Sequence, residues 1–180
     1  MPLIYHRKNK NSIIIGGKVE SNELGILWLG QGGFAFKTSR GKVIMVDPFL
    51  SFSARKDGMT YIHNYFPVDP NKIKVDYIFC THAHSDHTDK ETLISLSKAN
   101  PKAEFYGPIE SYKCFKNVGI SENRAFVVTL DSMIDIEEIK VKAVYSECTS
   151  EKRITHYGYF FNFNSAKVYI TGDTKIGLDS

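Results

Sequence analysis

Two short apolar segments, residues 42–46 and 75–80, constrain the fold of this 180-residue chain more than any other feature. Residues 43–46 read Val-Ile-Met-Val and residues 77–80 read Tyr-Ile-Phe-Cys, so neither stretch alternates apolar with polar side chains. A strand that exposes one face to water does alternate, whereas a continuously apolar strand is covered on both faces. The sequence therefore predicts a sheet whose central strands are buried on both sides.

The remaining pattern alternates short strands with two helices. Asp89 is a suitable N-cap for a helix that runs to about Ala99, and Pro108 opens a second helix that ends near Gly119. Further strands are expected at residues 25–30, 33–39, 103–107, 124–130, 133–136, 139–146, 157–163 and 167–171. We expect an α/β (α+β) class with a large mixed sheet. Trp28, in an apolar strand, is expected in the core.

Charge and cysteine content exclude several classes of protein. Lys and Arg number 23 against 20 Asp and Glu, and the net charge of +3 is too weak to favour nucleic acid as a partner. Three widely spaced cysteines indicate no disulfide framework and favour a reducing, cytoplasmic setting. No apolar run approaches a membrane span, and the charged N-terminus is not followed by a signal-peptide core. We therefore expect no membrane partner.

The strongest functional signal follows the second apolar strand directly. The chain places three histidines and one aspartate in six residues, as His82-x-His84-x-Asp86-His87. Side chains two apart in extended backbone project to the same side, so His82 and His84 can share one metal ion, while Asp86 and His87 can reach a second. Imidazole and carboxylate together suit zinc, manganese or iron. The alternative is a solvated histidine-rich turn that binds metal only adventitiously.

Two other carboxylates stand at strand ends. Asp47 follows the strand 42–46, and Asp173 follows the strand 167–171 through Gly172. If these strands lie beside the strand 75–80 in one sheet, the three ends meet at the edge where α/β proteins build ligand sites. Asp173 could then bridge two ions, and Asp47 could orient a ligating histidine. Taken alone, each is read more simply as a turn residue, and the histidine cluster favours the functional interpretation.

With these residues in place, the sequence resembles the metallo-β-lactamase-fold hydrolases. The resemblance rests on the histidine motif, the strand end at Asp47-Pro48 and the segment 172–174. Segments 29–34, 47–51, 86–93 and 101–105 are most similar to the L-ascorbate-6-phosphate lactonase branch. The resemblance implies a metallo-β-lactamase-like αββα sandwich with its metal site at one edge of the paired sheets. Residues 24–180 would form this domain, apparently without its C-terminal part, and residues 1–23 an N-terminal extension and first strand.

The resemblance also implies ligands and an activity. His82 and His84 would bind the first ion, Asp86 and His87 the second, and Asp173 would bridge them, with Asp86 and Asp173 serving catalysis. The cofactors would be one or two divalent ions, zinc or manganese, with iron as a third candidate. The implied reaction is hydrolysis by metal-bound hydroxide of a small-molecule substrate, such as a lactone or a phosphorylated sugar.

The chain departs from the family pattern at two places. Where the family carries a further histidine on the first ion, this sequence has Cys148, and Glu147 and His156 are alternative ligands. The family also places another histidine well after Asp173, whereas this sequence ends at Ser180. These departures support a second interpretation, a catalytically weak or inactive binding or structural relic of the same fold. A nuclease is disfavoured by the weak net charge, and a homo-oligomer is compatible with the sequence.

Overall fold

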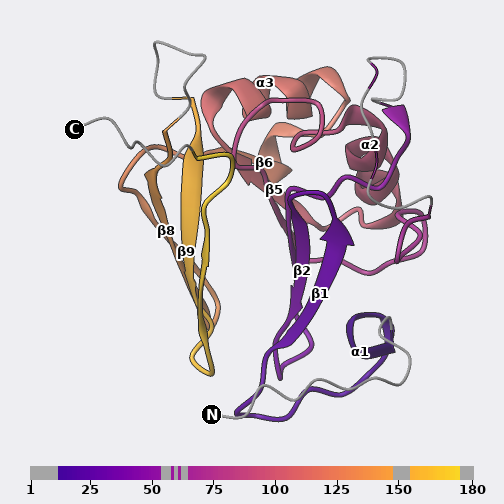
Figure 1. Ribbon diagram of the computed structural model, residues 1–180, viewed down its shortest axis with the longest axis vertical. Helices are drawn as coiled ribbons and strands as arrows, with labels where there is room; N and C mark the ends of the chain where they lie inside the picture. Colours follow the sequence, from indigo (N-terminus) through magenta and orange to yellow (C-terminus); the bar gives the residue numbers. More distant parts are fainter. Residues whose placement is uncertain (1–11, 54–57, 59–60, 62–64, 148–154, 175–180) are drawn as a thin grey trace.

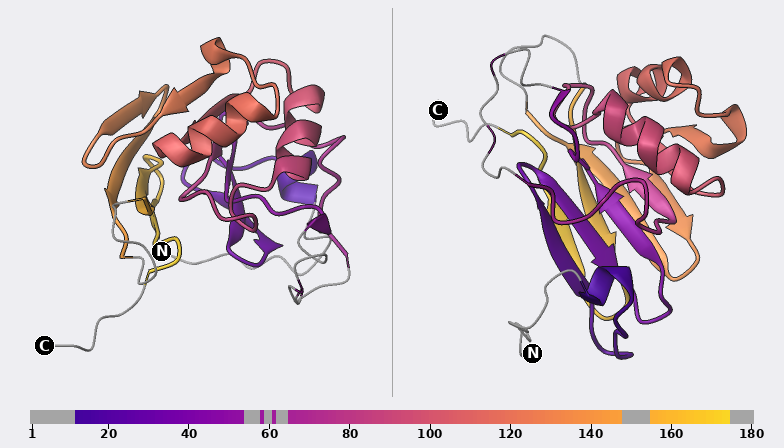
Figure 2. Two further views of the ribbon diagram at one scale, coloured as in Figure 1. Left: turned by 90° about the horizontal axis from the view of Figure 1, so that it is seen from above. Right: turned by 90° about the vertical axis from the view of Figure 1, so that its right-hand side faces the viewer.

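The structure, a computed structural model, describes residues 12–53, 58, 61, 65–147 and 155–174. Two β-sheets lie face to face, and helices cover the outer face of one of them (Figures 1 and 2). The first sheet has the strand order β1-β2-β3-β4-β5-β6 and the second has the order β10-β9-β8-β7. The predicted class, a mixed α/β metallo-β-lactamase-like fold, is confirmed. Of the described helices, none is long and apolar enough to cross a membrane.

The first sheet combines an antiparallel and a parallel half. Antiparallel pairing joins β1 to β2 and β2 to β3, and the pairs from β3 to β6 are parallel. Carboxyl ends of parallel strands meet at one edge, so the residues after β3 and β4 are brought together. The strands are β1 (Gly25–Gly30), β2 (Gly33–Lys37), β3 (Val43–Val46), β4 (Tyr77–Phe79), β5 (Glu104–Gly107) and β6 (Ala125–Val127).

Two helices and a short 3-10 turn connect the parallel strands. The helix α2 (Lys90–Ala99) begins at Asp89, whose side chain accepts the Thr92 N–H at 2.9 Å, as the capping prediction requires. The helix α3 (Ile109–Asn117) follows Pro108, and η2 (Glu122–Arg124) leads into β6. Both helices lie on the same side of the first sheet (Figure 2).

The second sheet is antiparallel throughout. It contains β7 (Met133–Ile136), β8 (Ile139–Tyr145), β9 (Tyr157–Asn162) and β10 (Lys167–Ile170). Along β8 the buried residues alternate with exposed lysines, so one face packs on the first sheet and the other faces away from it. Among the described residues no helix covers that outer face, so three of the four layers of the expected sandwich are present (Figure 1).

The central strand β3 explains why two cores form. Val43 and Met45 pack with the helices in one cluster, and Ile44 and Val46 pack between the sheets in the other. All four side chains are buried, which confirms the prediction from the apolar segment. The core between the sheets is largely aromatic, with Phe36, Phe79, Tyr159, Phe161 and Phe163 among its members.

One expectation about the N-terminal part was wrong. The described residues 12–23 contain a one-turn helix, α1 (Ser12–Ile15), and the first strand expected within residues 1–23 stays a prediction, because residues 1–11 lie outside the described residues. Ile14 of α1 is buried in the helix-side core. Trp28 is 42% exposed, because it pairs with Phe34 on the face turned toward the second sheet, at the free edge of β1.

Candidate metal centre

The histidine motif folds into a tight turn immediately after β4. The N–H groups of His87 and Thr88 both donate to the His84 carbonyl, at 3.0 and 2.8 Å. This turn brings the His82 ring to 4.5 Å from the His84 ring and 4.0 Å from the His87 ring, centroid to centroid. His82 and His87 are buried and His84 is exposed. The turn therefore gathers three imidazoles within one small volume.

A fourth imidazole comes from the second sheet. His156, the residue before β9, stacks on His82 with a centroid distance of 4.0 Å and an interplanar angle of 25°. His82, His84 and His156 each offer a nitrogen, and these three atoms lie within 4.8 Å of one another. Of the other candidates for this position, Glu147 is exposed and its backbone N–H donates to Thr174, while Cys148 lies outside the described residues.

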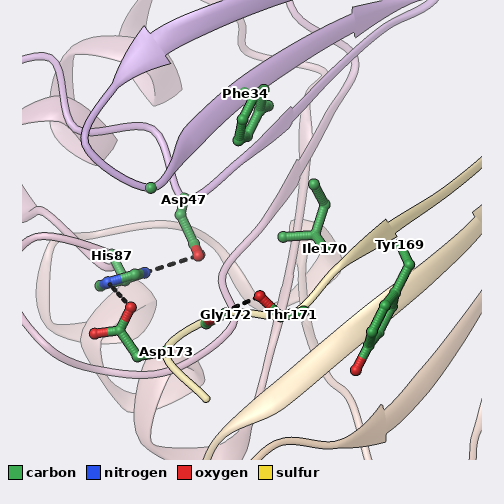
Figure 3. Close-up of a pocket in the computed structure, with 9 residues that line it drawn as sticks. Phe34, Asp47, His87, Tyr169, Ile170, Thr171, Gly172 and Asp173 are labelled. Carbon is green, nitrogen blue, oxygen red and sulfur yellow. Dashed lines mark hydrogen bonds and ion pairs between the residues drawn. The ribbon is translucent and has the colours of Figure 1, made fainter. Parts of the chain in front are cut away.

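A second group of donors combines His82, His87 and Asp173, again within 4.8 Å. His87 Nε2 lies 3.2 Å from an Asp173 oxygen (Figure 3). His82 Nε2 lies 4.0 Å from the other oxygen of Asp173. Asp86 lies beside them, with its carboxylate 3.5 Å from His87 Nε2. The expectation that Asp173 follows a strand of the same sheet as β4 was wrong, because β10 belongs to the second sheet. The two sheets nevertheless bring Asp173 to the histidines.

Asp47 contacts the turn that carries the histidine rings. Its buried carboxylate accepts the backbone N–H of Thr81 at 2.7 Å and the Thr81 hydroxyl at 2.6 Å. It also lies 2.8 Å from His87 Nδ1, so it can fix the orientation of that ring, as the sequence predicts. Asp47 has φ of +45°, in a left-handed region that non-glycine residues rarely occupy.

Sequence reasoning missed Thr81, which links the two sets of histidine contacts. Its hydroxyl donates to Asp47 and lies 3.0 Å from His82 Nδ1, so its oxygen can accept a hydrogen bond from the N–H of that nitrogen. Its carbonyl accepts the N–H of Tyr157, which follows His156. The available signal was its position directly before the histidine motif, where a hydroxyl can reach a ligand ring.

Sequence reasoning also missed the role of the glycines between β1 and β2. A Cβ atom on Gly32 would lie 3.1 Å from His87 Cε1, and one on Gly33 would lie 2.7 Å from the Asp47 carbonyl oxygen. The hairpin turn therefore packs backbone directly against the site. Consecutive glycines indicate such a close approach of two chain segments.

The pKa values of His82 and His87 are shifted in opposite directions. Burial, followed by the neighbouring His87 and His156 rings, lowers the pKa of His82 to about 2, so its imidazole is neutral. Burial also acts to lower the pKa of His87, but hydrogen bonds with Asp173 and Asp47 outweigh it and raise that pKa to about 10. The bond with His87 in turn lowers the pKa of Asp173 to about 2. In the absence of metal, the site thus holds a proton where a second cation would sit.

A pocket of about 260 Å³ opens beside these residues (Figure 3). Phe34, Tyr169 and Ile170 supply its apolar side, and His87 and Asp173 supply its polar side. A small molecule in this pocket would contact the carboxylate and imidazole directly.

The donor set fits divalent metal ions. Three buried imidazoles, the exposed imidazole of His84 and the Asp173 carboxylate converge on one volume, and such mixed nitrogen and oxygen ligands suit zinc, iron or manganese. For His87 to bind a metal ion, it would have to release the proton that it shares with Asp173. Ligation by His82, His84, Asp86, His87 and Asp173 stays a prediction, and the short distances between their donor atoms support it.

Comparison with known proteins agrees with the fold. The model of the family described as "Beta-lactamase superfamily domain" matches residues 25–180. A UPF0173 metal-dependent hydrolase of Polynucleobacter asymbioticus is 28% identical over 171 residues, covering 86% of this chain and 57% of that protein. A UPF0173 protein of Pyrococcus abyssi is 31% identical over 145 residues, covering 74% of this chain and 59% of that protein. The chain thus spans somewhat under two thirds of the length of these relatives.

Solved structures show the same fold. A putative metal-dependent hydrolase of Parabacteroides distasonis matches with a TM-score of 0.61 at 23% identity, covering 84% of this chain and 61% of that one. CmlA, a diiron β-hydroxylase of Streptomyces venezuelae, matches with a TM-score of 0.64 at 19% identity, covering 83% of this chain and 29% of that one. At these identities the likeness concerns the fold alone.

Proposed function

Because the chain belongs to the β-lactamase superfamily domain family, we propose that it forms the metal site of a metal-dependent hydrolase. The observation that carries this proposal is the convergence of two donor groups that share His82, one with His84 and His156 and one with His87 and Asp173. The name of the UPF0173 relative in Polynucleobacter, a metal-dependent hydrolase, supports the same conclusion.

Two divalent ions, zinc, manganese or iron, would be held by these residues together with Asp86. When bound, such ions lower the pKa of water and polarise a carbonyl or phosphoryl oxygen. The chain's own residues do the rest. Asp47 and Thr81 hold the rings of His87 and His82 in fixed orientations, and Asp173 places a carboxylate beside the pocket. The glycine turn at Gly32 lets this polar wall lie close to bound substrate.

We further propose that the substrate is a small lactone rather than a phosphorylated sugar. The nine residues that line the described pocket include no lysine or arginine, and Phe34 and Tyr169 offer apolar surface. A phosphate group is normally held by basic side chains or by several backbone N–H groups. The resemblance to the L-ascorbate-6-phosphate lactonase branch supports a lactone ring in the substrate. Whether the substrate also carries a phosphate group is a matter for the assay.

The decisive experiment combines metal analysis with hydrolysis assays. The wild-type protein should bind metal and hydrolyse a simple lactone when zinc or manganese is added. Replacing both His82 and His84 with alanine should abolish bound metal and turnover together. The double variant Lys140→Ala/Lys142→Ala, on the outer face of the second sheet, is the matched control. Unchanged metal content in the histidine variant would refute the proposal. A wild-type protein that holds one ion or none and shows no turnover would indicate the inactive relic instead.

We also propose a cytoplasmic location and a small-molecule partner rather than nucleic acid. Among the described residues Cys80 and Cys114 are both free thiols, which supports a reducing compartment. Separating the compartments of the source cell and detecting the protein with an antibody would test the location.

A further inference from the structure

Two threonine–histidine pairs, one from each sheet, meet in the metal centre. Thr81 Oγ1 lies 3.0 Å from Nδ1 of His82, and Thr155 Oγ1 lies 2.8 Å from Nδ1 of His156. In both pairs the threonine precedes its histidine directly in the sequence. The two imidazole rings stack at 4.0 Å, so the pairs are close counterparts in composition and in contacts.

The contact at Nδ1 determines which nitrogen of each ring faces the metal. A ligating histidine usually engages its other nitrogen with an oxygen, which fixes both the tautomer and the orientation of the ring. His82 shows this arrangement, because its Nε2 lies 3.0 Å from His84 Nδ1 and 4.0 Å from Asp173. In His156 the Nδ1 atom faces Thr155 and the Nε2 atom is fully buried. The His156 ring stacks on His82, and one of its nitrogens lies within 4.8 Å of nitrogens of His82 and His84.

The backbone holds His156 in this position from both sides. Its carbonyl accepts the N–H of Ser146 at 3.2 Å, which extends the pairing of β8 with β9 by one step. The next residue, Tyr157, donates its N–H to the Thr81 carbonyl at 3.0 Å. His156 is thus fixed to the strand that precedes it and to the turn that carries His82. Only 2% of its surface is exposed.

We propose that His156 is the third imidazole ligand of the first metal ion, and that Thr155 positions it. This inference rests on the proposed function, because it requires that the site binds metal. It differs from the sequence-based expectation, which placed Cys148 at the end of the preceding strand in that role. The third imidazole would then come from the residue just before β9, and His82, His84 and His156 would supply the three imidazoles of the first ion.

Cobalt(II) titration of the metal-free protein tests this inference without any activity measurement. Cobalt reports its ligands through its absorption spectrum, because a thiolate ligand adds an intense near-ultraviolet charge-transfer band that imidazole does not. We expect wild-type protein and Cys148→Ser to bind the first equivalent equally tightly and with the same spectrum. His156→Asn keeps a polar atom near Thr155 but has no Nε2. It should weaken binding of the first equivalent of cobalt by at least about a hundredfold, more than the loss of a residue that only contacts a ligand does.

A matched pair at Thr155 tests the positioning role. Thr155→Ser keeps the hydroxyl and should bind like the wild type, whereas the nearly isosteric Thr155→Val should bind roughly ten- to a hundredfold more weakly. Far-UV circular dichroism and thermal midpoints of the metal-free variants show whether each is folded. If His156→Asn does not fold, the Thr155 pair still decides the matter.

The outcomes separate this inference from the proposed function. If Cys148→Ser loses affinity and the wild type shows the thiolate band, Cys148 is the ligand and the inference is wrong, while the metal site stands. Equal affinity in wild type, His156→Asn and Thr155→Val would also overturn it. If the wild-type protein binds no cobalt, zinc or manganese at all, the proposed function itself fails.

Discussion

Asp47 is the residue whose replacement tests the electrostatics of the site most directly. Its carboxylate accepts two hydrogen bonds from Thr81 and lies 2.8 Å from His87 Nδ1, with 1% of its surface exposed. Asp47→Asn keeps the shape of the side chain and removes the charge. The amide nitrogen cannot accept a hydrogen bond from Thr81 or His87, so at least one buried contact is lost whichever way the amide points.

The effect depends on pH, and its sign follows from the protonation of His87. In the metal-free folded protein the pKa of His87 is raised to about 10, against 6.5 for an ordinary histidine. A raised folded pKa gives stability that is complete below pH 6.5 and is lost as the pH rises toward 10. The loss for one proton is about 1.4 kcal/mol per pH unit, or roughly 4 kcal/mol between pH 6.5 and 9.5.

Removing the Asp47 charge should therefore cost most at the lower pH. At pH 6.5 we expect the free energy of unfolding to fall by roughly 3–5 kcal/mol, the usual cost of deleting one partner of a buried ion pair. At pH 9.5 the difference from wild type should shrink, because at this pH most of the stability that comes from protonation of His87 is lost in both proteins.

Guanidinium unfolding at the two pH values, in the presence of a chelator, measures this difference. Cysteines, lysines and tyrosines that titrate near pH 9.5 are common to both proteins and cancel in the comparison. Asp135→Asn, on β7, is the matched control, since its carboxylate is exposed and makes only a weak ion pair with Lys140. A destabilisation by Asp47→Asn that is the same at pH 6.5 and 9.5 would refute the charge-pair reasoning.

Three further changes test other parts of the site. Gly32→Ala places a methyl group 3.1 Å from His87 and should weaken metal binding roughly tenfold or more, measured by isothermal titration. Gly16→Ala, where the added Cβ has nothing within 4 Å, is the control, and equal affinities in both variants would show that the turn at Gly32 can shift without disturbing the site. Asp173→Asn removes a negative charge from the second donor group, so titration should then show one class of tight site, and two persisting tight sites would make Asp173 a turn residue only. Thr88→Val removes a hydroxyl that donates to the His82 carbonyl and meets Ser111, so chemical unfolding should show a loss of about 1–3 kcal/mol that Thr88→Ser does not, and similar losses in both would point to packing instead.

Local patterns in the sequence predicted most of the fold. The apolar segment at β3, the cap at Asp89 and the proline before α3 each predict their own element, because the physical cause lies within a few residues. The short helix α1 was not predicted from the sequence; its Ile14 packs in a core whose other members lie far away in the chain. Trp28 was misplaced because exposure at a sheet edge depends on which strands pair, and the local pattern does not contain that information.

The site was predictable only in part, for the same reason. His82, His84 and His87 form one short motif, and the turn that gathers them is local. The contacts of Asp173 and His156 with that motif depend on how the second sheet packs on the first. A single sequence records no such packing. The position of His156 beside His82 thus became visible only in three dimensions.

The metal centre joins residues from the two sheets, and this has a consequence for folding. An ion held by His82 on one side and by Asp173 on the other would act as a removable cross-link between the layers. At a thousandfold excess over its dissociation constant, a ligand stabilises the form that binds it by about 4 kcal/mol, and here that energy would oppose separation of the sheets. The dependence also runs in reverse. A substitution that shifts the aromatic layer, where Phe36 and Phe161 lie 6.0 Å apart, would change metal affinity without altering any ligand. Metal content would then measure how well the two halves of the sandwich are docked.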